Sequence, residues 1–331
     1  MNSAVPSSAK QDADWTILYD EPQEAAWFRS LHPELKDAKE ESITSAQGRA
    51  SVKNVLAYDR PDIVLLHGDT PILVVEETVE VPSGHNVGQR FARIAAAAEC
   101  GVPCLYFGPY VAKKHGGITA GPRYMNVRLF HALDAMERAT KTSVTTINWP
   151  VDEHYEVRRD RDKDKDVREY IVVFFTAYKT HGLPDVNKIL LDSAIHRRMI
   201  LERNQFVANS IRNPEQYDGP PPSVELFLRP AFQHRHAVAA ETLPNTVNEV
   251  LLYNVGMTNI RSDPYTGMAI LYRYLYIVEK PSRALILWFP NITAAMWHTA
   301  AARGNRKDIK LFRIAADAIL FKDGLLLRAA L

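Results

Sequence analysis

The residues most able to do chemistry lie in one short segment of the chain. Asp62 begins the apolar run DIVLL, and Glu76 and Glu77 end the apolar run ILVVEE. If residues 67–71 form the connecting loop, the two runs pair as a hairpin in which Asp62 lies opposite Glu76. A different loop length would place Glu77 there instead, so both glutamates are candidate partners of Asp62.

Two carboxylates that face each other across a strand pair are suited to binding a metal ion. They repel each other and raise each other's pKa unless a cation lies between them. Because hard oxygen ligands suit Mg²⁺, the pattern predicts a magnesium site formed by Asp62 with Glu76 or Glu77. The metal would polarise a phosphate and lower the pKa of its bound water, as phosphodiester hydrolysis requires. A glutamate at a strand end could instead emerge into solvent, but the preceding ILVV indicates a buried strand, where an unpaired carboxylate is costly.

Further polar residues share the face of the acid pair or follow it on the next helix. Thr78 and Glu80 have the same strand parity as Glu76 and are candidate catalytic residues. Gln89, on the helix expected next, is another candidate, and an exposed helix face is an equally good interpretation of its position. His85 and Arg90, at the start of that helix, are candidate DNA contacts.

The segments around these acids predict an α/β core over residues 15–150. Apolar spacing and turn residues predict helices at 21–31, 82–101 and 121–142, and strands at 52–58, 62–66, 72–81, 102–108 and 144–148. The order is therefore helix, three strands, helix, strand, helix, strand. A hairpin meander followed by a strand–helix–strand crossover gives a mixed central sheet flanked by helices.

Pro61-Asp62 followed by ILVVEET resembles the signature of the PD-(D/E)xK nuclease superfamily. That signature has an Asp on the second core strand, an acidic residue on the third and a Lys two residues later. The predicted αβββαβ order is also similar to the core of that superfamily, which includes many restriction endonucleases. The resemblance covers under half of the chain. It implies a Mg²⁺-dependent DNA endonuclease of the type II restriction kind that cuts double-stranded DNA as a homodimer.

The chain departs from this signature at the lysine position, where it has Thr78. Thr carries no positive charge, so the resemblance implies that another residue helps to activate the water. The candidates are Glu80, His85, Gln89, Arg90, Lys113 and Lys114. The departure also leaves open a catalytically inactive nuclease fold that only binds nucleic acid. A repair or defence nuclease acting on structured DNA or RNA is a further alternative.

Residues 151–331 predict an α+β extension that provides target recognition or dimer contacts. We expect a solvent-exposed loop at 152–170, a strand at 169–178 and a helix at 184–204. Strands are expected at 283–290 and 316–321, on either side of a helix at 292–303. These strands could form a separate sheet or extend the first one.

The charge and hydropathy of the chain limit how it could bind nucleic acid or a membrane. The net charge of +1 excludes a protein-wide positive field, so DNA contact would depend on local basic clusters such as Lys113 and Lys114. The N-terminal residues do not resemble a signal peptide, and no apolar run is long enough to span a membrane. We therefore expect a cytoplasmic protein with no membrane partner.

Overall fold

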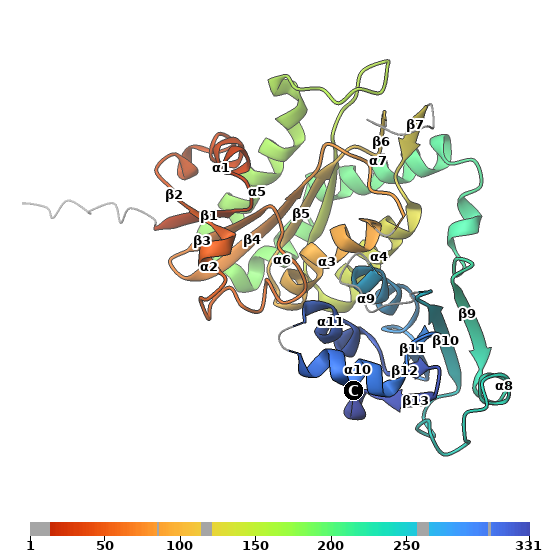
Figure 1. Cartoon of the computed structure of the whole chain (residues 1–331). Coiled ribbons are helices and arrows are strands. Elements are labelled where there is room, and N and C mark those ends of the chain that lie inside the picture. Colours follow the sequence, from red (N-terminus) through yellow and green to blue (C-terminus); the bar gives the residue numbers. More distant parts are fainter. Residues whose placement is uncertain (1–13, 85, 114–120, 257–264, 304–305) are drawn as a thin grey trace, which may run out of the picture.

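Two β-sheets form the framework of the molecule, and a layer of helices lies between them (Figure 1). The computed structural model describes residues 14–84, 86–113, 121–256, 265–303 and 306–331. The α/β class predicted from the sequence is confirmed. Within the described ranges, no helix combines the length and the apolar character that crossing a bilayer requires.

The first sheet is mixed and has six strands in the order β2-β1-β3-β4-β5-β8. Along the chain these are β1 (Trp15–Tyr19), β2 (Lys39–Ser42), β3 (Ile63–His67), β4 (Thr70–Glu77), β5 (Cys104–Gly108) and β8 (Val144–Asn148). Strands β1, β3 and β4 are antiparallel neighbours, whereas β4, β5 and β8 run parallel. The end of β4 and the start of β3 therefore lie at the same edge of the sheet as the carboxyl ends of β5 and β8.

The hairpin between β3 and β4 has the register that the sequence predicts. Ile63 pairs with Val75, and extending this register by one residue places Asp62 opposite Glu76. The turn is shorter than the predicted loop, because Gly68, with φ of 58°, and Asp69 make it. A β-bulge between Leu65 and Leu66 compensates for the shorter turn and keeps the predicted pairing near the acids.

Helices cover both faces of this sheet, which is why its central strands are apolar throughout. Helices α3 (Asn86–Glu99) and α4 (Val127–Thr140) cover one face. The other face is covered by α1 (Pro22–Arg29), α5 (Lys165–His181), α6 (Leu183–Leu191) and α7 (Ala194–Ser210). The short elements α2 (Ile43–Ala46), β6 (Val111–Lys113) and β7 (Pro122–Tyr124) lie at the periphery.

The second sheet has the order β13-β12-β11-β10-β9 and is separate from the first. Its strands are β9 (Val224–Leu228), β10 (Glu249–Asn254), β11 (Arg283–Phe289), β12 (Ala318–Phe321) and β13 (Gly324–Leu327). One face packs on α9 (Tyr265–Tyr276), α10 (Ala294–Ala302) and α11 (Lys307–Ala315), and the other on α8 (Arg229–Arg235). Because α9 also packs on α3 and α4, one hydrophobic core runs through both sheets.

The αβββαβ order predicted for the first core is wrong at its start. Residues 52–58 form turns rather than a strand, because the buried Val52, Val55 and Tyr58 recur at intervals of three residues. The strand that pairs with β3 on that side is β1, which precedes α1. The observed order up to β5 is therefore strand, helix, strand, short helix, two strands, helix, strand, and the sheet still contains the predicted hairpin and crossover.

Three expectations for residues 151–210 are also corrected. The strand predicted at 169–178 lies within α5, because its buried Tyr170, Ile171, Phe174 and Phe175 line one face of a helix. The exposed loop predicted at 152–170 ends early, since a 3-10 helix begins at Arg161. The helix predicted at 184–204 is divided in two, and Ser193 caps the second part by accepting a hydrogen bond from the backbone N–H of His196 at 3.2 Å.

Candidate functional site

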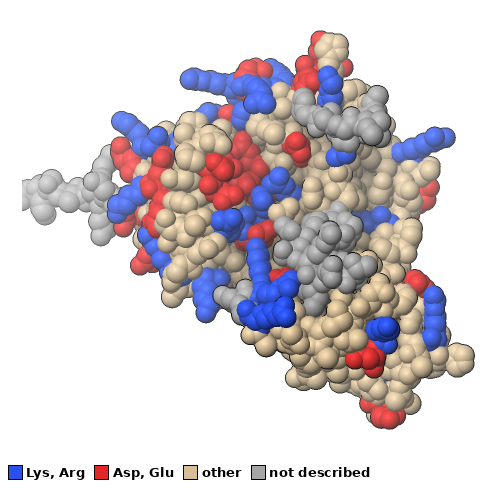
Figure 2. Space-filling view, viewed as in Figure 1, with Lys and Arg blue, Asp and Glu red and all other residues tan. Residues whose placement is uncertain are grey.

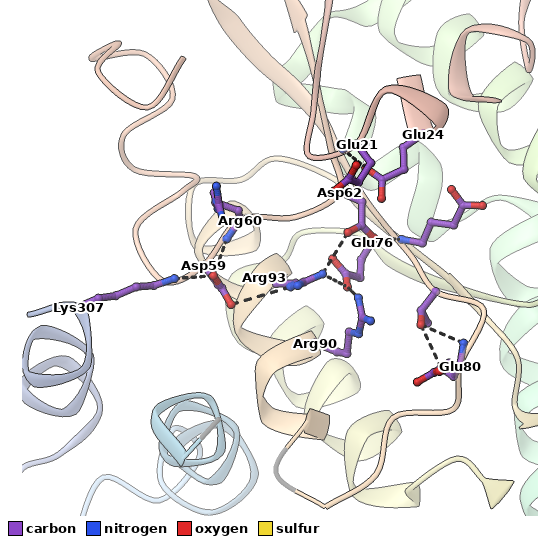
Figure 3. Close-up of polar contacts among 12 residues, drawn as sticks. Glu21, Glu24, Asp59, Arg60, Asp62, Glu76, Glu80, Arg90, Arg93 and Lys307 are labelled. Atoms are coloured by element: carbon purple, nitrogen blue, oxygen red, sulfur yellow. Dashed lines mark hydrogen bonds and ion pairs between the residues drawn. The ribbon is translucent and has the colours of Figure 1, made fainter. Parts of the chain in front are cut away.

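Acidic side chains from three elements meet where β4 ends (Figure 3). Asp62 immediately precedes β3, Glu76 is the last buried residue of β4, and Glu24 lies on α1. The backbone N–H of Asp20 donates to the Asp62 carbonyl at 2.9 Å and so holds the segment before α1 against the start of β3. The carboxyl ends of parallel strands are a common place for ligand sites in α/β proteins.

Asp62 and Glu76 are buried, with 4% and 0% of their surface exposed. One Asp62 oxygen, Oδ2, accepts a hydrogen bond from the backbone N–H of Glu77 at 2.6 Å. The other, Oδ1, lies 3.1 Å from Nη1 of Arg93, and the same nitrogen lies 2.9 Å from Oε1 of Glu76. The cation between the two carboxylates is therefore a guanidinium.

Two arginines from one face of α3 neutralise the acid pair. Arg90 is three residues before Arg93, so the two side chains project together, and both are bonded to Oε1 of Glu76. Burial alone would lower the pKa of Arg90, but Glu76 and Asp62 outweigh it and raise that pKa. Both arginines are therefore charged at any pH at which the protein is handled.

Two carboxyl groups near the end of β4 have raised pKa values. Burial is the main cause of the raised pKa of Asp62, about 9, and the nearby charge of Glu76 adds to it. Burial likewise raises the pKa of Glu24 to about 7, with further contributions from Asp20 and Glu76. Perturbed carboxyl groups that gather at one place are typical of functional sites.

Glu77 faces a different environment from Glu76. Burial raises the pKa of Glu77 to about 7, while the positive charge of Lys163 opposes that rise. Lys163 is itself enclosed: it pairs with Asp164 at 2.6 Å, and its ammonium lies 4.2 Å from the centre of the Trp149 ring. The rings of Trp27 and Phe107 complete this aromatic enclosure at 5.2 and 5.3 Å. Of the two alternatives, the strand pairing puts Glu76, and not Glu77, opposite Asp62.

The residues of the acid pair fit a magnesium ion in part. Among the described residues, no group of three or more His, Cys, Asp and Glu side chains has the arrangement of a metal site. Mg²⁺, however, is usually held by one or two carboxylates and keeps several waters. Oε2 of Glu76 is buried and has no hydrogen-bond partner among the described residues, so it remains as an acceptor. Asp62 and Glu76 therefore fit Mg²⁺ as a two-carboxylate site beside Arg93, in which the metal would displace the proton that burial holds on Asp62.

Thr78 and Glu80 take part in a local turn. The Thr78 hydroxyl donates to the Glu80 carbonyl at 3.1 Å and accepts from the Glu80 N–H at 3.2 Å. The Thr78 methyl group lies over Gly108, where a Cβ atom would come within 2.6 Å of it. The Glu80 side chain is exposed. Thr78 therefore closes the turn that follows β4, and its hydroxyl is not directed at the acid pair as the strand parity predicts.

The remaining predicted residues are dispersed. Gln89 lines a cavity of about 510 Å³ between α3, α9 and α11, together with Arg93 and Lys307. Lys113 is exposed at the end of β6 and pairs with Glu156 at 2.9 Å. His85 and Lys114 lie outside the described residues.

Basic residues that the sequence analysis did not select lie beside the acidic edge. A cavity of about 670 Å³ follows β8 and is lined by Arg158, Arg161, Lys163, Lys165 and Arg168, with Asn148, Pro150, Asp162, Asp166 and Glu202. Figure 2 shows acidic and basic side chains side by side over the part of the molecule built on the first sheet, whereas the part built on the second sheet is largely uncharged on this face.

Two residues of the acid cluster itself were also missed. Arg93 could have been found from its three-residue spacing to Arg90 on a helix whose opposite face is apolar. Glu24 carries no comparable signal, because a glutamate in the first turn of a helix is common.

Comparison with protein-family models, with curated proteins and with solved structures gives no match for this chain, so the resemblance to the PD-(D/E)xK superfamily stays a prediction.

Proposed function

We propose that this chain hydrolyses phosphodiester bonds in DNA with Mg²⁺ held by Asp62 and Glu76. The observation that supports this most is the buried carboxylate pair, formed by adjacent strands and facing one shared cation position. Removing a carboxylate from water costs several kcal/mol before its ion pairs and hydrogen bonds offset that cost. Two buried carboxylates at one place therefore favour a role in chemistry.

The chain's own residues orient the reacting groups. When bound, Mg²⁺ supplies a water of lowered pKa and a Lewis acid for the phosphate. The Glu77 N–H holds Asp62 in place. Arg90 and Arg93, on α3, supply the positive charge that the lysine of the family signature would provide, since this chain has Thr78 at that position. Their guanidinium groups can stabilise the negative charge that grows on the phosphate oxygens. The water oxygen bonds to phosphorus, one P–O ester bond breaks, and the leaving oxygen takes up a proton, which gives a phosphate monoester and a hydroxyl.

The proposed substrate is DNA, a polyanion, because basic residues flank the acidic edge. Arg158, Arg161 and Lys165 line the cavity after β8, next to the ends of the strands that carry the acids. Contacts of this kind to phosphates position a nucleic acid without reading its sequence. Cleavage of both strands requires a second centre, which a homodimer would provide.

A second candidate function is nucleic-acid binding without hydrolysis. It is favoured by the ion pairs of Arg90 and Arg93, which occupy Asp62 Oδ1 and Glu76 Oε1, and by the threonine at the lysine position. In this case the arginines would neutralise the acids permanently, and Mg²⁺ would not bind.

The two candidates are separated by variants of the acid pair. Asp62→Asn and Glu76→Gln should each reduce Mg²⁺-dependent cleavage of plasmid DNA by at least about a hundredfold, the loss typical for a group that stabilises the transition state. Titration calorimetry should show Mg²⁺ binding to the wild type that is lost in both variants. The exposed Glu241, in the second half of the chain, provides the control variant Glu241→Gln.

Wild-type turnover by a folded Asp62→Asn protein would contradict the proposed hydrolysis. Binding of DNA with neither cleavage nor Mg²⁺ binding would favour the second candidate. Addition of EDTA should stop cleavage by the wild type, and cleavage that continues in EDTA would also contradict the proposal.

A further inference from the structure

Four strands of each sheet, with the helices between them, follow one another in the same order. In the first half, the antiparallel pair β3–β4 is followed by α3, the parallel strand β5, α4 and the parallel strand β8. In the second half, the antiparallel pair β9–β10 is followed by α9, the parallel strand β11, α10 and α11, and the parallel strand β12. Strand directions and neighbours agree for these four strands, so the second unit repeats the core of the first. Strands β1 and β2 beyond β3, and β13 beyond β12, have no counterpart in the other sheet.

The strand registers identify which residues correspond. Ile63 pairs with Val75 on β4, and Val224 pairs with Tyr253 on β10. The side chains to compare are those that face the helix after each hairpin. Glu76 faces α3, where Arg90 and Arg93 bind it, and the pair that faces α9 at the same edge of the second sheet is Val224 and Tyr253. Val224 therefore corresponds to Asp62 and Tyr253 to Glu76, so the second unit has uncharged residues where the first has its acid pair.

The helices that follow the two hairpins meet through equivalent glycines. Gly88 lies on α3 and Gly267 lies on α9, the helix that follows the hairpin in each unit. A Cβ atom on Gly88 would lie 2.2 Å from the backbone nitrogen of Met268, and one on Gly267 would lie 2.2 Å from the Gly88 carbonyl oxygen. Equivalent residues touch each other in this way when two copies are related by a two-fold axis, as in a symmetric dimer.

The contact between helix and hairpin is repeated as well. Arg93 lies five residues after Gly88 and binds Asp62 at 3.1 Å. Tyr272 lies five residues after Gly267, and its ring meets that of Tyr253 edge-on, with the ring centres 4.9 Å apart. The second unit thus keeps the geometry of the first with neutral groups in place of charged ones.

We infer that the chain is a fused pair of nuclease-like units, in which the second unit takes the place of a partner subunit and carries no acid pair. The expected cleavage product rests on the proposed function, whereas the arrangement of the two units does not. A molecule with one centre breaks one strand of a DNA duplex for each productive encounter, so its product is a nick. The fused pair replaces the homodimer that the family resemblance implies, because the α3 surface that would meet a partner is already covered by α9.

The inference is tested by particle mass and by the product of cleavage. Light scattering during gel filtration should give the single-chain mass of 37.4 kDa over a wide concentration range. Supercoiled plasmid should be converted first to open circles, and linear DNA should arise only after independent nicks accumulate. Tyr253→Phe, which removes only the hydroxyl at the position of Glu76, should cleave at the wild-type rate, whereas Asp62→Asn should not cleave.

Three outcomes would count against the fused pair. These are a particle of twice the single-chain mass, linear DNA formed directly from supercoiled plasmid, and a loss of cleavage in Tyr253→Phe as large as that in Asp62→Asn. Single-chain mass without any cleavage would contradict the proposed hydrolysis and would still support the fused pair, since the mass does not depend on activity.

Discussion

At the scale of single residues, one guanidinium determines the electrostatics of the acid pair. Nη1 of Arg93 lies within hydrogen-bond distance of both Asp62 and Glu76, whose side chains are almost fully buried. Removal of one member of a buried ion pair leaves an uncompensated charge and typically costs about 3–5 kcal/mol. The arginine therefore allows both acids to lie in the core whether or not a metal ion is present.

The raised pKa of Asp62 predicts a specific dependence of stability on pH. The folded protein holds this proton up to about pH 9, whereas the unfolded chain releases it near the ordinary value of 3.8. The neutral form of Asp62 therefore stabilises the folded state relative to the unfolded chain. This contribution to the free energy of unfolding is complete below pH 3.8 and is lost as the pH rises to about 9. Asp62→Asn has no such proton, so its free energy of unfolding should fall less between pH 5 and pH 9, by a difference of roughly 1 kcal/mol or more.

Urea denaturation of the wild type and Asp62→Asn at several pH values measures this difference. Asp69→Asn is a matched control, because Asp69 is exposed in the turn of the same hairpin. Parallel pH curves for the wild type and Asp62→Asn would show that Asp62 ionises normally in the folded protein.

At the scale of elements, the contact between α3 and α9 joins the two halves of the molecule. Gly88→Ala adds a methyl group 2.2 Å from a backbone nitrogen, where no side-chain rotation can relieve the overlap. Although alanine is the better helix former by about 1 kcal/mol, the two helices must separate. We expect a net loss of roughly 1–3 kcal/mol in the free energy of unfolding.

Chemical denaturation compares this variant with Gly48→Ala, whose added methyl group would have no described atom within 4 Å. Gly48→Ala should change stability by less than about 1 kcal/mol. If Gly88→Ala proves more stable than the wild type, the close approach of the two helices is wrong.

Much of the first sheet could be predicted, because its elements are regular. The hairpin and the helix after it have clear apolar patterns, and an assumed loop at residues 67–71 placed Asp62 opposite Glu76, with Glu77 as the alternative. Residues 52–58 and 169–178 were misassigned because short runs of valine, isoleucine and aromatic residues favour strands by composition. In the second case the tertiary packing selects a helix, and only the spacing of its buried residues shows it.

The electrostatic partners of the acids were harder to predict than the acids. A strand pairing is local, whereas the contact of Arg93 with Asp62 depends on how α3 crosses the sheet. The same limitation applies to the second unit. Its correspondence with the first lies in the strand registers and in the contact between Gly88 and Gly267, which the sequence alone does not show.

At the scale of the whole molecule, the distribution of charge matters more than its sum. The net charge is only +1, yet basic residues gather around the cavity after β8, at the edge that carries the acids. If this surface binds the DNA backbone, the combined variant Arg161→Gln and Lys165→Gln should lower affinity for all sequences about equally. The slope of log affinity against log salt should also become shallower by about 0.9 for each lost phosphate contact.

Fluorescence anisotropy with labelled duplexes at several salt concentrations measures both effects. Lys280→Gln and Lys322→Gln together remove the same net charge from exposed positions in the second half and should leave the slope unchanged. Equal losses in the two double variants would show that overall charge, and not the surface after β8, governs binding.

The enclosure of Lys163 also gives the protein an optical property. The rings of Trp27 and Trp149 both stack on the Phe107 ring, with ring centres 5.8 and 4.5 Å from that of Phe107. The Lys163 ammonium lies 5.2 Å from the centre of the Trp27 ring and 4.2 Å from that of the Trp149 ring. Phe107 is on β5 and pairs with Glu77, so the two indoles lie next to the edge that carries the acids. A charged ligand bound there alters the electric field at both indoles. Their intrinsic emission can therefore report occupancy of this edge in the unlabelled protein.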